Sequence, residues 1–303
     1  MVDASTVKEL RDRTGAGMMD CKKALVETNG DLEKAIEFLR EKGLAAAAKK
    51  AGRIAAEGLI GTYVSDDMKM GAIVEVNCET DFVAKNQEFI DFVNSMAKLV
   101  VDRKLDDVEQ LNETEYNGMK VKEALSTLIA KIGENMTIRR FERFSVEIGA
   151  IVSYIHGGGR IGTLVQLEST VVNDILVELG KDIAMQVAAM SPLYINESDV
   201  PNDYIEKERE ILRVQALNEG KKPEVVEKMI EGRLKKQLKE ICLMDQLFVK
   251  DGERTIAKLL NDKSKEIGSE ISISRFVRFE KGEGIQKRED NFAEEVMSQM
   301  KNK

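Results

Sequence analysis

Residues 58–76 read GLIGTYVSDDMKMGAIVEV, and residues 149–167 read GAIVSYIHGGGRIGTLVQL. The two stretches align without a gap, and each has two β-branched, apolar runs around a polar or glycine-rich turn. This pattern is typical of a β-hairpin. The identical pairs are Gly58/Gly149, Ile60/Ile151, Tyr63/Tyr154, Gly71/Gly162 and Val74/Val165. The repeat predicts an α+β protein with a core of two related α+β subdomains, each with a small antiparallel sheet.

The segments around the two hairpins are predicted to be mainly helical. Apolar residues recur at helical spacing after each hairpin, and the insert at residues 102–131 is mostly charged and is expected to be helical. Residues 198–241 contain two charged amphipathic helices around a turn at 218–223, which predicts a projecting antiparallel helical hairpin at 201–241. The strand-like residues 272–279 are expected to rejoin the second sheet.

The two ends of the chain are predicted to form separate helical modules. Near the N-terminus, three short helices with glycine-punctuated turns are similar to a ubiquitin-associated domain, with Asp31 capping the third helix. Residues 43–58 are rich in Ala and Lys and are interpreted as a linker helix. An apolar stripe of Phe292, Val296 and Met300 predicts a C-terminal helix. The predicted units are residues 1–54, 55–145, 146–280 (with the hairpin) and 281–303.

The composition excludes several classes of function. The 303 residues include 46 basic and 54 acidic ones, a formal net charge of −8, which argues against direct nucleic-acid binding. Three widely spaced cysteines, Cys21, Cys78 and Cys242, indicate a reducing compartment rather than a disulfide framework. No apolar run approaches the roughly 20 residues of a membrane span, and the chain's start lacks a signal peptide's apolar core. We therefore expect a cytoplasmic protein that does not bind a membrane.

The motifs of known catalytic sites do not fit this sequence. Residues 157–162 match Gly-x-Gly-x-x-Gly, but they precede a predicted strand, which favours a hairpin turn over a dinucleotide site. His156 is the single histidine, so we expect no histidine-based metal site and no cofactor. Its place beside the glycines favours a solvated turn residue over a contact to a partner. Met18 and Met19 start a helix, where core packing is a commoner role than an exposed binding surface.

The segment that stands out is residues 75–86, EVNCETDFVAKN, which joins the first hairpin to the following helix. In one interpretation Thr80 or Asp81 caps that helix, and Phe82, seven residues before Phe89, lies on its buried face. In the other, Asp81 and Phe82 are exposed at the turn and bind a partner. The second repeat carries Val-Val-Asn at this place, so the fold itself does not require an acid followed by an aromatic. The residues alone leave both interpretations open.

Two long motifs, TDFVAKN at residues 80–86 and LRDRTGAGMMDCKKAL at residues 10–25, closely resemble the translation elongation factor Ts family. The resemblance extends to KIGEN at residues 131–135, to His156-Gly157 and to the segment at 278–284, so it covers essentially the whole chain. The sequence departs from the family pattern in the charged insert near residues 102–120 and in a third glycine after His156. With no transit segment before the first module, the chain resembles the bacterial form.

The resemblance implies a guanine nucleotide exchange factor for elongation factor Tu that performs no covalent chemistry. In this family the acid–aromatic pair inserts beside the partner's nucleotide site, disturbs its Mg²⁺ coordination and promotes GDP release. The first module and the C-terminal helix would hold the partner's GTPase domain, the second core subdomain its far domain, and the helical hairpin a further surface. The implied partner-binding residues are Thr80, Asp81, Phe82 and Val83, with Arg13, Met18, Met19 and His156 as further contacts.

The implied partner is elongation factor Tu in its GDP-bound and nucleotide-free forms. The sequence leaves open whether the protein is a monomer or a homodimer within a two-plus-two complex. Two alternatives come from other classes: a general chaperone or adaptor built on a ubiquitin-associated-like module, and an enzyme that uses Cys78 or His156. Neither explains the motif at residues 80–86, and the enzyme lacks a recognisable acid–base pair.

Overall fold

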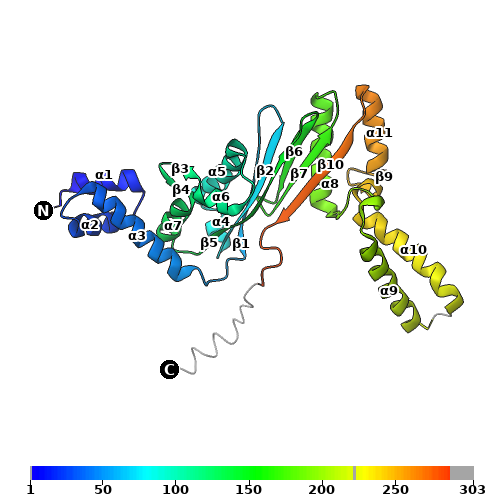
Figure 1. Cartoon of the computed structure of the whole chain (residues 1–303), viewed down its shortest axis with the longest axis horizontal. Coiled ribbons are helices and arrows are strands. Elements are labelled where there is room, and N and C mark those ends of the chain that lie inside the picture. Colours follow the sequence, from blue (N-terminus) through cyan, green and yellow to red (C-terminus); the bar gives the residue numbers. More distant parts are fainter. Residues whose placement is uncertain (1, 221–222, 287–303) are drawn as a thin grey trace.

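The protein is elongated, with a module of three helices at one end, a projecting pair of helices at the other and a core with two sheets between them (Figure 1). The computed structural model describes residues 2–220 and 223–286. Its helices and small antiparallel sheets confirm the predicted α+β class. The helix predicted from Phe292, Val296 and Met300 lies outside the described residues. Within the described ranges, no helix has both the length and the apolar character that crossing a membrane requires.

The N-terminal module consists of α1 (Ala4–Thr14), α2 (Met18–Glu27) and α3 (Leu32–Lys50), which enclose a small apolar core. Asp31 caps α3 as predicted, because its side chain accepts the backbone N–H of Lys34 at 3.1 Å. The buried side chains of this core are Val7, Leu10, Cys21, Ala24, Leu25 and Ala35.

The second half of α3 takes the place of the predicted linker helix. The helix continues to Lys50, and the residues from 51 to 56 are not helical. This half packs against α7 (Val121–Ile132): a Cβ on Gly43 would lie 3.7 Å from the carbonyl oxygen of Ser126, and Ala47 contacts the neighbouring core. The small side chains that suggested a linker without core contacts are the ones that allow this close approach.

Two related three-stranded sheets form the core. The repeated hairpins are present as predicted, and in each sheet a third, antiparallel strand pairs with the second strand of the hairpin. The third strand of the second sheet is the predicted one, whereas that of the first sheet was not expected. The first sheet contains β1 (Glu57–Val64), β2 (Met70–Cys78) and β5 (Met136–Ser145), and the second contains β6 (Ala150–His156), β7 (Ile161–Glu168) and β10 (Ser272–Glu280). The helices α5 (Gln87–Arg103) and α8 (Asp174–Met190) pack on the first and second sheet, respectively.

The two sheets exchange equivalent contacts. The backbone N–H of Ile60 donates to the Gly159 carbonyl at 2.8 Å, and that of the repeat-equivalent Ile151 donates to the Met68 carbonyl at 2.8 Å. The side chains are also reciprocal, because an arginine of each sheet stacks on a phenylalanine of the other. The Arg140 guanidinium lies 4.1 Å from the Phe279 ring centre, and that of Arg275 lies 4.2 Å from the Phe144 ring centre. The two copies are thus joined by reciprocal contacts.

The insert between the sheets contains a short strand pair as well as helices, so the purely helical expectation was incomplete. Its elements after α5 are α6 (Val108–Glu113), β3 (Glu115–Tyr116), β4 (Met119–Lys120) and α7. Beyond α8 follow η1 (Glu197–Asp199), α9 (Asn202–Asn218), α10 (Pro223–Ile241), η2 (Leu243–Asp245), β8 (Leu247–Phe248), β9 (Asp251–Thr255) and α11 (Ile256–Ile267).

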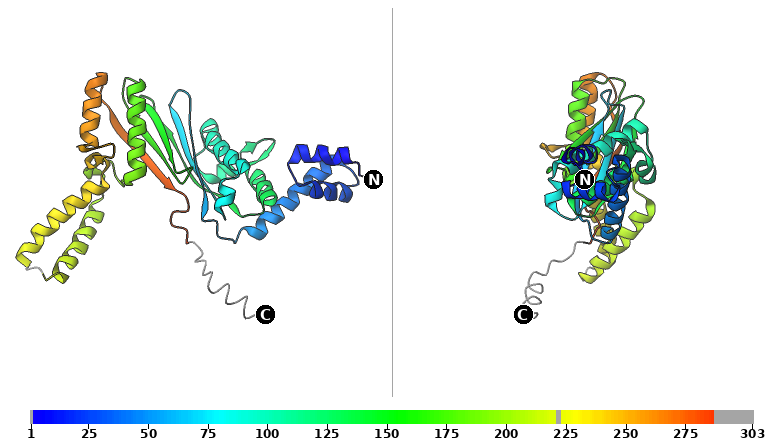
Figure 2. Two further views of the ribbon diagram at one scale, coloured as in Figure 1. Left: turned by 180° about the vertical axis from the view of Figure 1, so that it is seen from behind. Right: turned by 90° about the vertical axis from the view of Figure 1, so that its left-hand side faces the viewer.

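The helices α9 and α10 form the projecting hairpin, which is seen from two further sides in Figure 2. A narrow apolar contact of Ala216, Val226 and Ile230 joins them. Ion pairs between the helices flank this contact, among them Arg213 with Glu227 at 3.1 Å. The hairpin is therefore stabilised mainly by its own pairing.

Candidate functional site

The strand β2 leads into a short elbow, residues 79–84, that contains the one-turn helix α4 (Asp81–Ala84). The Thr80 hydroxyl caps this helix and accepts the backbone N–H of Val83 at 3.4 Å. Val83 and Ala84 are buried against the core of the first subdomain, which anchors the inner side of the elbow. Capping by Thr80 therefore confirms one part of the first interpretation of this segment.

Phe82 is not buried. Its side chain is 80% exposed, whereas Phe89 is fully buried. The helix containing Phe82 ends at Ala84, and Asn86 caps a new helix, α5, by accepting the backbone N–H of Glu88 at 2.9 Å. Because this break changes the helical phase, the seven-residue spacing no longer places Phe82 and Phe89 on one face. The interpretation of Phe82 as a core residue was wrong.

Asp81 precedes Phe82 on the outer side of the elbow, where its side chain is half exposed. A hydrogen bond from Lys85 Nζ, at 2.7 Å from the Asp81 carboxylate, lowers the pKa of Asp81 from its ordinary value. The carboxylate is consequently ionised at neutral pH. The elbow thus presents a negative charge beside an exposed aromatic ring.

A second segment, between α7 and β5, holds the base of the elbow. The Glu134 carboxylate accepts the backbone N–H of Thr80 at 3.0 Å and its hydroxyl at 2.6 Å. In return, the Glu79 carboxylate accepts the backbone N–H of Asn135 at 2.5 Å. We call these four residues the clasp. Sequence reasoning assigned Glu134 and Asn135 no role, and the family-like motif at residues 131–135 was their single signal.

The methionines of the N-terminal module are exposed, 54% at Met18 and 73% at Met19, so the core-packing interpretation of this pair was wrong. Both lie in the first turn of α2. An unbranched, polarizable side chain on a surface suits an adaptable protein contact.

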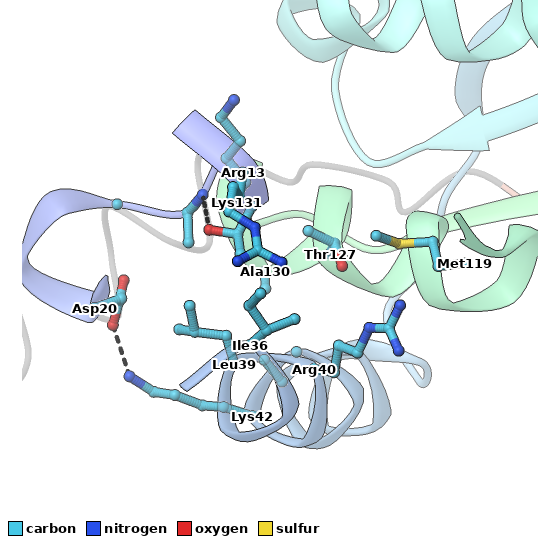
Figure 3. Close-up of a pocket in the computed structure, with 15 residues that line it drawn as sticks. Arg13, Asp20, Ile36, Leu39, Arg40, Lys42, Met119, Thr127, Ala130 and Lys131 are labelled. Atoms are coloured by element: carbon cyan, nitrogen blue, oxygen red, sulfur yellow. Dashed lines mark hydrogen bonds and ion pairs between the residues drawn. The ribbon is translucent and has the colours of Figure 1, made fainter. Parts of the chain in front are cut away.

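Arg13 lines a cavity of about 180 Å³ where the N-terminal module meets α7 (Figure 3). Its guanidinium is paired with Glu33 at 2.8 Å. The other cations of the cavity wall are paired as well: Lys42 with Asp20 and Lys131 with Glu88, both at 2.6 Å, and Arg40 with Glu123 at 3.9 Å. The charges of this wall are therefore balanced within the protein.

His156 is exposed at the end of β6, and its Nδ1 lies 3.1 Å from the Tyr154 hydroxyl. The three following glycines have positive φ angles and form the turn to β7, as predicted, rather than the start of a helix. No group in this turn supports a dinucleotide site.

The three cysteines are buried and free. Burial raises the pKa of Cys78 to about 12 and that of Cys242 to about 11, so neither is a thiolate at neutral pH. Among the described residues, no cluster of His, Cys, Asp or Glu has the arrangement of a metal site. The sequence-predicted residues lie on four separate elements, namely α1, α2, the elbow with α4, and β6. This spread is typical of a protein-binding surface rather than of a catalytic pocket.

A family model described as Elongation factor TS matches residues 79–283, a region that begins at the first residue of the elbow. The chain belongs to the elongation factor Ts family. Elongation factor Ts of Clostridium perfringens (strain ATCC 13124) is 62% identical to it over 98% of both chains. That of Clostridium novyi (strain NT) is 61% identical over the full length of both, and that of Clostridium botulinum (strain Eklund 17B) is 58% identical over 99% of both. The likeness to elongation factor Ts thus includes the N-terminal module, which lies outside the residues that the family model matches.

Proposed function

We propose that this protein is the guanine nucleotide exchange factor of elongation factor Tu and acts in the cytoplasm. It binds the GDP-bound partner, promotes GDP release and catalyses no covalent reaction. Membership of the elongation factor Ts family supports the exchange function. The observation that carries the mechanism is the exposure of Phe82 on a capped, anchored elbow.

In this mechanism the elbow enters the partner beside the bound nucleotide. Phe82 separates two elements of the partner, and the ionised carboxylate of Asp81 disturbs the coordination of the partner's Mg²⁺. Thr80 and Val83 contribute by fixing the backbone on either side of this pair. An exposed apolar ring favours the bound state, because burying it removes apolar surface from water.

A single phenylalanine is not sufficient for the exchange. Burying one such side chain contributes about 1.5–3 kcal/mol. Weakening nucleotide binding by roughly ten thousandfold requires about 5.5 kcal/mol of differential affinity. We therefore propose that Arg13, Met18 and Met19 on the N-terminal module, and His156 on the second sheet, contribute further binding free energy.

The coupling between nucleotide and exchange factor must be reciprocal. If the protein weakens GDP binding by a given factor, GDP weakens the protein's binding to elongation factor Tu by the same factor. The same linkage allows a fresh nucleotide to displace the exchange factor. The protein therefore binds the nucleotide-free partner most tightly.

Release of a fluorescent GDP analogue from elongation factor Tu, with and without this protein, tests the proposal. We expect the release rate to rise in a saturable manner with protein concentration. A release rate that does not change would contradict the exchange function. Binding to many unfolded clients, with no preference for elongation factor Tu, would favour the chaperone or adaptor alternative.

A further inference from the structure

The clasp continues the pairing of β2 and β5 beyond the end of the sheet. The last ladder pair is Cys78 with Met136, and the clasp residues lie directly beyond it. There the pairing changes from backbone to side chain: Glu134 accepts from Thr80, and Glu79 accepts from Asn135. The two connections are reciprocal, since the glutamate of each segment receives the backbone N–H of a residue in the other.

Phe82 depends on this support because its own side chain makes little contact with the protein. The ring is 80% exposed, so packing does not fix its direction. The helix that carries it has four residues, and a helix of one turn is not stable by itself. The direction of Phe82 must therefore come from the backbone of the elbow.

Thr80 is the residue through which a group outside the elbow, the Glu134 carboxylate, holds the elbow backbone. Its hydroxyl donates to Glu134 and accepts the backbone N–H of Val83, while its carbonyl accepts the Cys78 thiol at 3.1 Å. Glu134 thus orients the hydroxyl that caps α4. Hydrogen bonds in such a chain strengthen one another, and a charged acceptor makes the strongest link.

The clasp is also joined to the segment that leads from α3 to β1. Asn135 donates its side-chain amide to the Arg53 carbonyl at 2.8 Å, and the Arg53 guanidinium donates to Glu79 at 3.4 Å. Arg53 lies just beyond the end of α3 at Lys50. The clasp therefore contacts both the elbow and the segment that follows the N-terminal module.

We propose that Glu134 is a positioning residue for Phe82: through Thr80 it holds the elbow in the orientation that enters the partner. This inference rests on the proposed exchange function. It predicts that removal of the Glu134 carboxylate slows GDP release although Glu134 itself makes no contact with the nucleotide. Because Glu134 acts through Phe82, its effect depends on the presence of the ring.

A double-mutant cycle tests this dependence. The maximal rate of analogue release from elongation factor Tu is measured for the wild type, Glu134→Ala, Phe82→Ala and the double variant. We expect Glu134→Ala to lower the stimulated rate by about tenfold in the wild-type background and by less than about twofold in the Phe82→Ala background. Equal fold-changes in both backgrounds would overturn the proposal, because they would show a direct contact or a general loss of structure.

Two controls make the result specific. Glu113 on α6 is an exposed glutamate that forms ion pairs with Lys120 and Lys122. Glu113→Gln removes its charge and should leave the rate of GDP release unchanged. If Glu134→Ala does not fold, Glu134→Gln keeps the side-chain volume but removes one of the two acceptor oxygens, and it should slow release in the same Phe82-dependent way.

Amide hydrogen exchange on the free protein separates this inference from the function on which it rests. Loss of the Glu134 carboxylate should speed exchange of the Thr80 and Val83 amides by about tenfold or more, while the buried turns of α5 stay protected. Unchanged hydrogen-exchange rates of the Thr80 and Val83 amides would overturn the positioning role of Glu134 even if the protein stimulates GDP release. No stimulation by the wild type, with the elbow amides responding as expected, would instead contradict the exchange function alone.

Discussion

At the scale of single residues, the sequence predicted the cap of the elbow but not the exposure of its aromatic ring. Thr80 and Asp81 were both recognisable as candidate caps from residue type and position, because capping depends on neighbours within three residues, and the structure assigns the cap to Thr80. The exposure of Phe82 could not be decided from the sequence, since a helix break at Lys85 and Asn86 changes its helical phase relative to Phe89. The Glu134–Thr80 hydrogen bonds join residues 54 positions apart, and no local pattern encodes such a contact.

Phe82→Ala should leave the fold intact and impair the function. Because the ring is exposed, we expect the free energy of unfolding to change by about 0.5 kcal/mol or less. The stimulated release of GDP should slow by about tenfold or more, which corresponds to the loss of one buried aromatic contact in the complex. The matched control is Phe89→Ala, a buried position where truncation should cost about 3–5 kcal/mol in a thermal or urea melt. A comparable loss of stability in both variants would contradict the exposed placement of Phe82.

Cys78 should be unreactive although it lies directly before the elbow. Burial raises the pKa of this thiol to about 12, so at pH 8 roughly one molecule in ten thousand carries the reactive thiolate. We expect iodoacetamide to leave Cys78 unmodified in the folded protein at pH 8 and to modify it in urea, as measured by peptide mass spectrometry. Labelling should increase with pH, because the thiolate fraction rises as the pH approaches this pKa. Rapid labelling of the folded protein at pH 8 would contradict the burial of Cys78.

At the scale of elements, the amphipathic helices and the repeated hairpins were predictable, whereas β5 was not. Its sequence, MTIRRFERFS, has a run of charges at the middle of the strand. The structure pairs two of these charges across the sheet, where the buried Glu75 carboxylate on β2 bonds to Arg139 at 3.0 Å and Arg140 at 2.6 Å. The partner carboxylate lies 64 residues or more away in the sequence. The residues of β5 and their neighbours therefore do not by themselves indicate that this charged segment is a strand.

The hairpin of α9 and α10 should be removable as an element. We would replace residues 201–239 by a short Gly-Ser bridge and keep the segment from Ile241 to Leu243, because it pairs with the backbone at Leu193 and Tyr194. The shortened protein should retain a cooperative melt and part of its exchange activity, with lower helical content by circular dichroism and weaker binding to elongation factor Tu. The reason is that the apolar contact of Ala216, Val226 and Ile230 is internal to the hairpin.

Ile230→Ala in the full-length protein serves as the matched control for the excision. It should loosen the hairpin while leaving the amide protection of both sheets unchanged, because Ile230 belongs to the internal contact. An aggregated or molten excision product would show instead that the hairpin supports the main core.

At the scale of the whole molecule, the internal repeat indicated two related subdomains but not their mutual dependence. Each copy completes the other, since Ile60 and Ile151 donate to the opposite turn and Arg140 and Arg275 stack on the opposite phenylalanines. A sequence alignment of the copies shows likeness within each hairpin and contains no information about contacts between them. The reciprocal contacts imply that the subdomains unfold together, although each has its own apolar cluster.

Alanine substitutions at the equivalent glycines Gly58 and Gly149 test this dependence. Both have a positive φ, 138° and 136°, and a Cβ there would overlap the carbonyl oxygen of Val76 or Leu167 on the neighbouring strand. Backbone strain alone costs roughly 1–3 kcal/mol, and the overlap adds to it, so each variant should be destabilised by about 2 kcal/mol or more. Gly252→Ala, where the Cβ would meet open space, should be nearly neutral. Because the sheets are joined reciprocally, Gly149→Ala should reduce the amide protection of β1 and β2 as much as that of β6 and β7. If the loss were confined to the second sheet, the subdomains would unfold independently, and their reciprocal contacts would contribute little to stability.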